Sequence, residues 1–264
     1  MKKLFLLVLF AALLMPMMAA AQSAFDGTWK LDLGTAQMPK KPDVYLLQNG
    51  TYECKTCVPP IKVKADGTDQ SVTGHPYYDM ASIRVVDDRT IEETDKRGGV
   101  VVATSRTVVS PDNKTADFQF SDSTATNGGA PVTGKGQMMR VDKGPSGSHA
   151  ISGGWRTAKL ENISDNGLLV SYKTDGDTLM MTSPTGQSYN AKLDGTDSPY
   201  KGDPGTTSVS VKRISKNIME ETDKRDGKVI TVARMTVSDD GKTMKIDVSD
   251  KLHGTTSAFT AMKQ

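Results

Sequence analysis

The sequence is poor in the residues on which most enzymes and metalloproteins depend. Its 264 residues include three histidines, two cysteines and two tryptophans, and aromatic residues make up 6% of the chain. The histidines are scattered and no second cysteine pair exists, so the chain offers no zinc ligand set. It also lacks a Gly-X-Ser-X-Gly elbow, a phosphate-binding loop, a dinucleotide fingerprint and a His-Glu-X-X-His motif. We therefore expect no metal, no cofactor and no catalytic residues, and the sequence leans away from an enzyme.

An excess of charge of one sign is also lacking. The chain carries 33 basic and 31 acidic residues, a formal net charge of +2, and their signs alternate along the sequence. Nucleic acids and anionic membrane surfaces are recognised by basic patches, and no block of like charge supplies one here. We expect no nucleic-acid partner.

Long apolar runs are confined to the first residues. Lys2 and Lys3 precede the run Leu4 to Leu14, and three alanines, Ala19 to Ala21, follow as a small-residue cleavage site. The run is too short to span a bilayer as a mature helix. These features predict a signal peptide over residues 1–21, no integral membrane segment after its cleavage, and a location in the periplasm or outside the cell.

The most informative feature that is present is an internal repeat. Glu92 to Arg97 reads Glu-Glu-Thr-Asp-Lys-Arg and returns as Glu220 to Arg225, 128 positions later. Over residues 92–116, 14 of 25 positions match their partners at this offset. A period of this length corresponds to a whole domain rather than to a solenoid unit.

The repeat predicts two similar domains in tandem. The first copy covers residues 25–141 and the second covers 149–264, joined by a linker at 142–148 that is rich in glycine, serine and proline. Each copy, at about 115 residues, is long enough to bury its own small core. We expect a monomer.

Both copies show a β pattern almost throughout. Val, Thr, Ile and Ser dominate, and turn signals recur every eight to twelve residues or so, among them Asp226-Gly227 and Gly98-Gly99. A meander of about eight short strands has exposed edges unless it closes into an up-and-down barrel. The predicted fold is all-β, with two homologous antiparallel barrels.

Each copy opens with a Gly-X-Trp sequence, Gly27-Thr28-Trp29 in the first and Gly153-Gly154-Trp155 in the second. This opening resembles the first strand of lipocalin-like (calycin-like) proteins, in which the tryptophan plugs one end of the barrel. The resemblance implies a late basic residue beside each tryptophan, for which Arg140 and Lys263 are the candidates. The whole chain also resembles a group of exported bacterial proteins with the same two-copy layout and no assigned activity.

The only cysteines form the motif Cys54-Lys55-Thr56-Cys57. A redox-active pair of this spacing places its first cysteine at a helix N-terminus, but Val58-Pro59-Pro60 does not permit a helix here. The repeat aligns the motif with the turn Thr182 to Thr185, and exported proteins meet an oxidising compartment. We predict a structural disulfide across a β-turn.

Three further motifs allow a structural and a functional interpretation. Asp66-Gly67-Thr68-Asp69 and its copy Asp194 to Asp197 predict turns, because the rest of a calcium ligand set is missing. The loop His75-Pro76-Tyr77-Tyr78-Asp79 carries groups suited to acid–base chemistry, although its counterpart at Asp203 keeps only the Gly-X-Pro turn signal. We favour a turn here and keep a catalytic loop as the alternative.

The repeated Glu-Glu-Thr-Asp-Lys-Arg segment has no large apolar residue. As a strand it places Glu92, Thr94 and Lys96 on one face, and Glu93, Asp95 and Arg97 on the other. It is either a solvated hairpin arm with cross-strand ion pairs or the wall of a polar barrel lumen. We favour the solvated arm.

Arg106 and Arg234 are matched arginines within otherwise apolar or small-residue strands. Inside a barrel they would bind a ligand carboxylate; outside it they would pair with the charged neighbouring strand. An eight-stranded barrel holds about one small ligand. The favoured function is an exported binding protein for a small, mostly apolar or acidic-lipid ligand, with Arg106, Arg234, Trp29 and Trp155 as the ligand-binding candidates. The alternatives are an envelope structural or interaction module with filled cores, and an enzyme that uses the His75–Asp79 loop.

Overall fold

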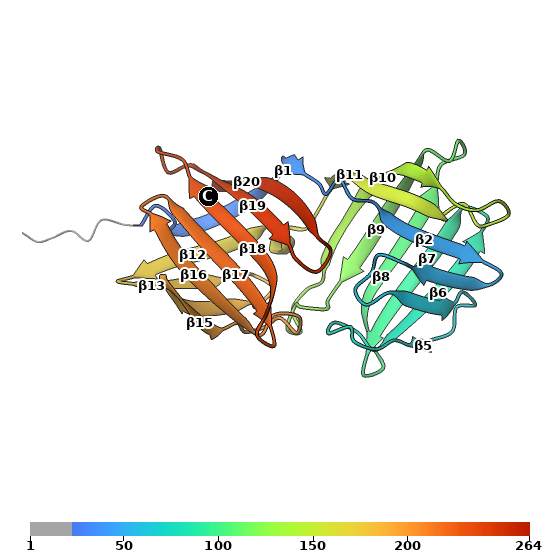
Figure 1. The fold of residues 1–264 in the computed structure, drawn as a ribbon, viewed down its shortest axis with the longest axis horizontal. Helices are drawn as coiled ribbons and strands as arrows, with labels where there is room; N and C mark the ends of the chain where they lie inside the picture. The colour runs from blue at the N-terminus through green and yellow to red at the C-terminus, as the bar shows by residue number, and fades with distance from the viewer. Residues whose placement is uncertain (1–22) are drawn as a thin grey trace, which may run out of the picture.

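A computed structural model describes residues 23–264, so the predicted signal peptide lies outside the described residues. Two antiparallel sheets of ten strands each make up the fold, and each sheet curls into a nearly closed barrel (Figure 1). The all-β prediction and the two barrels are confirmed, but each barrel has ten strands rather than eight. The described part of the chain contains no helix with the length and apolarity that a membrane crossing requires.

Barrel 1 is formed by one continuous segment of the chain. Its strands are β2 (Asp43–Gln48), β3 (Thr51–Cys54), β4 (Ile61–Lys64), β5 (Gln70–Ser71), β6 (Met80–Asp87), β7 (Thr90–Arg97), β8 (Val100–Val109), β9 (Thr115–Asp122), β10 (Val132–Lys143) and β11 (Gly153–Glu161).

Barrel 2 combines the first strand of the chain with its last nine. Its strands are β1 (Gly27–Gln37), β12 (Leu169–Asp175), β13 (Thr178–Thr182), β14 (Ser188–Lys192), β15 (Asp194–Pro199), β16 (Ser208–Ser215), β17 (Ile218–Arg225), β18 (Lys228–Val237), β19 (Thr243–Asp250) and β20 (Thr255–Lys263).

The two copies have exchanged their first strands. Strand β1 pairs with β12 and β20 in barrel 2, whereas β11 pairs with β10 and β2 in barrel 1. The spatial units are therefore 43–161, and 27–37 with 169–263, which differ from the predicted domains 25–141 and 149–264. The predicted linker at 142–148 is the end of β10 and the turn into β11 within barrel 1. Residues 38–42 and 162–168 are the segments that cross between the barrels.

One end of each barrel is closed by its tryptophan. Trp29 and Trp155 are both fully buried, and their Nε1 atoms donate to the backbone oxygens of Phe25 (2.8 Å) and Ile151 (2.7 Å). The two tryptophans thus occupy equivalent environments, as the repeat predicts. The late basic residues are exchanged too, because Arg140 lies 4.0 Å from the Trp155 ring and Lys263 lies 5.2 Å from the Trp29 ring.

Apolar side chains fill the core of each barrel from the tryptophan to the repeated acidic segment, where Val209 lies opposite Asp223 and Ile83 opposite Glu93. In barrel 2 the fully buried side chains include Leu179, Val209, Val211, Met219 and Met244. In barrel 1, Ile83, Val109 and Ala116 pack against Trp155 in the corresponding cluster. These strands alternate inward apolar and outward polar residues, which is the pattern of a sheet with one face in the core.

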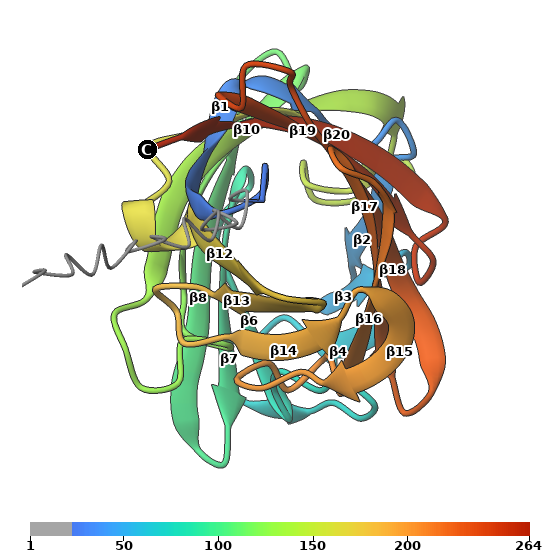
Figure 2. The ribbon, with the colours of Figure 1, turned by 90° about the vertical axis from the view of Figure 1, so that its left-hand side faces the viewer.

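The opposite end of each barrel, which we call the mouth, faces the other barrel. Asn127 in the β9–β10 loop donates from Nδ2 to the backbone oxygens of Thr185 and Gly202, both at 3.0 Å, and Gln187 Nε2 donates to Ala125 O (2.6 Å). Viewed along the long axis, the strands of the two barrels lie one behind the other as a ring (Figure 2). The tryptophan ends therefore point away from each other.

Candidate binding site in the barrel lumen

The repeated acidic segment forms a strand in each barrel, β7 and β17, and its two faces differ sharply. On the outer face Glu92 pairs with Arg84 and Arg106. Lys96 Nζ lies 2.6 Å from Asp69, and its repeat partner Lys224 lies 2.5 Å from Asp197. The interpretation as a solvated arm is therefore correct for this face. The other face turns inward, so the lumen interpretation is correct for Glu93, Asp95 and their counterparts.

Two carboxyl groups lie side by side within barrel 1. Burial raises the pKa of Glu93 to about 7, and burial together with the charges of Glu93 and Asp122 raises the pKa of Asp95 to about 8. The Oδ1 atom of Asp95 is buried and has no hydrogen-bond partner among residues 23–264. A buried carboxylate without a partner is costly, so this pair is poised to hold a proton or to meet a donor.

Barrel 2 contains the same pair. Burial raises the pKa of Glu221, and burial with the charges of Glu221 and Asp203 raises the pKa of Asp223 to about 8. Tyr189 donates its hydroxyl to Glu221, while Asp223 Oδ1 is buried without a partner in the described chain. We call Glu93 with Asp95, and Glu221 with Asp223, the lumen acid pairs.

Three tyrosines surround each lumen acid pair. Burial, with the nearby carboxylates, raises the pKa of every one of these phenols, so they remain hydroxyl donors; they are Tyr45, Tyr52 and Tyr78 in barrel 1, and Tyr172, Tyr189 and Tyr200 in barrel 2. The sets coincide in part: Tyr45 and Tyr172 lie opposite the equivalent glycines Gly153 and Gly27. The others differ, since Tyr189 aligns with Ile61 and Tyr78 aligns with Thr206.

The lumen acid pairs lie beside fully buried apolar side chains but are themselves reached by water. Ile83 lies opposite Glu93 and Val211 opposite Glu221, and both are fully buried, whereas all four residues of the lumen acid pairs keep an intermediate exposure to water. Inward-facing Ser105 on β8, which lies opposite Glu93, is also partly exposed, as is Phe120 on β9. A water-accessible, acidic and phenol-lined region therefore adjoins the closed apolar end.

The matched arginines lie outside this region. Arg106 is paired in register with Glu92 on the outer face, and its side chain is 38% exposed. Arg234 is exposed and lies opposite Glu220 in the equivalent register. Each arginine lines an open groove on the outside of its barrel. Of the two positions considered for Arg106 and Arg234, the structure shows the outer one, because strand alternation places them on the face of Glu92 rather than that of Glu93.

The His75–Asp79 loop does not assemble a catalytic group. His75 stacks on Tyr78 with ring centroids 5.0 Å apart, and Asp79 accepts a hydrogen bond from the Gly98 backbone (2.9 Å). Tyr77 points across to barrel 2 and donates to Asp203 Oδ1 (3.0 Å). The loop thus contacts its own repeat counterpart and serves as a contact between the two mouths.

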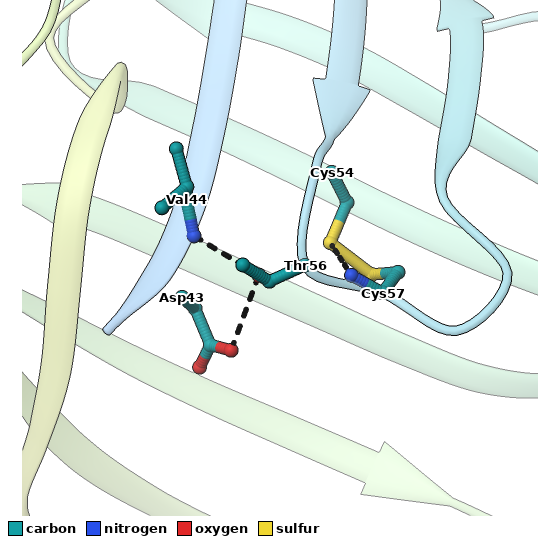
Figure 3. Close-up of a disulfide and its surroundings, with 5 residues drawn as sticks. All are labelled: Asp43, Val44, Cys54, Thr56 and Cys57. Atoms are coloured by element: carbon teal, nitrogen blue, oxygen red, sulfur yellow. Dashed lines mark hydrogen bonds between the residues drawn. A yellow bond between two sulfur atoms is a disulfide. The ribbon is translucent and has the colours of Figure 1, made fainter. Parts of the chain in front are cut away.

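The predicted disulfide is present. Cys54 and Cys57 are bonded across the β3–β4 turn, and the described residues contain no free cysteine. Within the same turn Thr56 Oγ1 accepts a hydrogen bond from the Val44 backbone (3.0 Å) and lies 3.4 Å from Asp43 Oδ1 (Figure 3).

The Asp-Gly-Thr-Asp motif forms a bend between β4 and β5 in barrel 1, as predicted, whereas its copy Asp194 to Asp197 is the first part of β15 rather than a turn. Asp66 and Asp194 each accept a hydrogen bond from the backbone of the threonine two residues later. Within residues 23–264, no group of three or more His, Cys, Asp and Glu residues is placed to hold a metal ion.

Two groups of residues were not predicted from the sequence: the tyrosines of the lumen, and a second polar cluster where the barrels meet, formed by Lys41, Arg156 and His253. Alternation within Glu92 to Arg97 was a usable signal for the acid pairs. Of the tyrosines, Tyr45 and Tyr172 occupy equivalent strand positions, but the other four do not, so the repeat gives little signal for the set. The chain matches no protein-family model, no curated protein and no solved structure.

Proposed function

We propose that the chain is an exported binding protein that holds a small molecule in the mouth half of each barrel lumen. The observation that carries this proposal is the lumen acid pair, which occurs in both barrels with a buried oxygen that lacks a partner. A barrel that needed only to be filled gains nothing from a carboxyl pair with a buried, unpartnered oxygen, because burying such a group opposes folding. Sites whose titration is strongly perturbed are commonly functional.

The lining favours a ligand that is mostly apolar with a basic or hydrogen-bond-donating end. Phe118 and Phe120 supply an apolar wall, while the acid pair and the phenols supply acceptors and donors. An acidic lipid, which the sequence analysis included, is disfavoured because its carboxylate would meet Glu93 and Asp95 without a cation nearby.

The test begins with native mass spectrometry of protein purified from its own host, to detect a retained small molecule. The variants Ser105→Trp and Ala233→Trp place a bulky ring inward, directly opposite Glu93 and Glu221. The matched controls Thr104→Trp and Val232→Trp place the same ring on the outer face of the same strands. We expect retained ligand, or binding of an amine-bearing apolar probe such as dodecylamine, to be lost in the first pair and kept in the second.

A structural module without a ligand is the second candidate, favoured by the filled apolar cores of both barrels. That function is supported instead if the wild-type protein retains nothing and binds neither dodecylamine nor a neutral apolar alcohol of the same length.

A further inference from the structure

The structure assigns a second binding site, for a small oxyanion, to a recess between the two barrels. The recess has a volume of about 210 Å³. Its wall is formed by the β1–β2 crossing segment, the disulfide turn of barrel 1, strand β11, and the β19–β20 turn of barrel 2. Three basic side chains, Lys41, Arg156 and His253, line it together with the hydroxyls of Thr56, Thr157 and Thr255.

Two of the three basic side chains of the recess, Lys41 and Arg156, have no ion-pair partner, whereas His253 is paired with Asp250. Among the residues that the structure describes, no carboxylate oxygen lies within ion-pair distance of Lys41 or Arg156. The Nε atom of Arg156 is buried and makes no hydrogen bond to the described chain. A buried guanidinium donor without an acceptor is costly, and carboxylate or phosphate oxygens are its best-matched partners.

Two acidic side chains, Asp250 and Asp43, also line the recess; burial raises the pKa of Asp43, against the lowering effect of the Thr56 hydrogen bond and of the charges of His253 and Lys41. Asp250 accepts hydrogen bonds from the backbones of Leu252 and His253, and its Oδ2 lies 2.6 Å from His253 Nδ1. Asp43 is directed to the disulfide turn, where Thr56 Oγ1 lies 3.4 Å from its carboxyl. Lys41 Nζ donates to His253 O (2.6 Å), which holds the ammonium at the recess and leaves its other protons free.

The repeat provides an internal control for this arrangement. The counterpart of Arg156 is Lys30, the residue after the other tryptophan. Lys30 Nζ lies 2.8 Å from Asp165, which belongs to the other crossing segment. The corresponding crossing segment beside Arg156 contains Lys40 and Lys41 instead of an acid. The crossing segment therefore supplies an ion-pair partner to Lys30 but none to Arg156.

The repeat also explains why there is space on only one side. Residues 123–131 join β9 to β10 and reach into barrel 2 through Asn127. The equivalent connection between β19 and β20 is the short turn 251–254. Because the turn 251–254 is shorter, it leaves open the space beside Lys41 and Arg156. In the other half of the molecule, the longer loop occupies the corresponding space.

Calorimetric titration of the full mature chain with inorganic phosphate and with acetate, at constant ionic strength set by chloride, tests the assignment. We expect saturable binding of at least one of the two, and the preferred anion identifies the group as phosphate or carboxylate. Arg156→Met and Lys41→Met should each weaken binding roughly ten- to a hundredfold, since each removes a charge-assisted contact. Lys30→Met, the matched control, should leave it unchanged.

Circular dichroism establishes that each variant is folded. Because Lys41 is exposed, Lys41→Met tests the site even if Arg156→Met destabilises the chain. Absence of saturable binding to the wild-type protein, or an equal loss in Lys30→Met, would overturn the assignment.

Discussion

The lumen acid pairs bind protons over a different pH range from the surface carboxylates. An unfolded aspartate or glutamate releases its proton near pH 4, whereas Glu93, Asp95 and Asp223 retain theirs to about pH 7 to 8 in the folded chain. Between these limits the folded state binds more protons than the unfolded state, so the free energy of unfolding falls as the pH rises. Surface acids with lowered pKa values, such as Glu92 and Asp66, act in the opposite direction and only at lower pH.

We therefore expect the melting temperature to fall between pH 5 and pH 8. The double variant Asp95→Asn/Asp223→Asn removes the two groups with the highest carboxyl pKa values in the lumen. It should raise the melting temperature at pH 8, change it little at pH 5, and flatten the slope between them. Asp69→Asn, which removes a surface partner of Lys96, is the control and should leave the slope intact. A double variant that melts at a lower temperature than wild type at pH 8 would contradict buried, proton-holding carboxyls.

At the scale of single residues, only part of the candidate site could be predicted from the sequence. The sequence predicts two chemically distinct faces for Glu92 to Arg97, but both carry charge, so no hydrophobic signal identifies the inward one. The choice is made by neighbouring strands, which place Arg106 opposite Glu92 and Ser105 opposite Glu93. That register is a long-range property, and it is the reason that the sequence alone left both the inner and the outer position open for the arginines.

At the scale of the strands, the exchange of β1 and β11 determines the barrel in which each tryptophan is buried. Trp29 is covalently part of the first copy but packs in barrel 2, and Trp155 packs in barrel 1. The sequence predicted the tryptophan ends and the meander, because these depend on local pattern. It contained no signal for the exchange, because two homologous first strands fit either barrel equally well by pattern.

Replacing one tryptophan should loosen the barrel of the other copy. Trp29→Ala and Trp155→Ala should each cost about 3–5 kcal/mol, the usual range for a large side chain deleted from a core. In hydrogen exchange, Trp29→Ala should lose protection in β12 and β20, and Trp155→Ala in β2 and β10. Loss of protection in β2 and β10 after Trp29→Ala would show that each copy closes on itself.

The disulfide is confined to one turn and should matter little to the fold. Because the bond closes a very short loop, Cys54→Ser should lower the free energy of unfolding by about 2 kcal/mol or less. Urea denaturation measures the change, and intact mass with alkylation before and after reduction should show two protected thiols in the wild-type protein. A variant that fails to fold would mean that buried Cys54 anchors the core as well as the turn.

At the scale of the whole molecule, the two barrels differ in how the chain builds them. Barrel 1 takes all ten strands from residues 43–161, whereas barrel 2 needs both ends of the chain. We expect the fragment 43–161 to fold alone, with a cooperative melting transition and a buried Trp155. The fragment 169–264 lacks β1 and should remain unfolded or aggregate until a peptide covering residues 23–37 is added. Equal behaviour of the two fragments, measured by circular dichroism and tryptophan emission, would contradict this asymmetry.

The pairing of β1 with β20 has a consequence for the order in which the molecule is completed. A ribosome releases β1 long before β20, so β1 has to wait, paired on one side at most, until residues 255–263 have been made. Barrel 1 meets no such delay. A product that stops before β20 would therefore leave β1, Trp29 included, with β12 as its one strand partner, while barrel 1 keeps all ten strands. Through this single pairing, closure of barrel 2 depends on the last of the described strands.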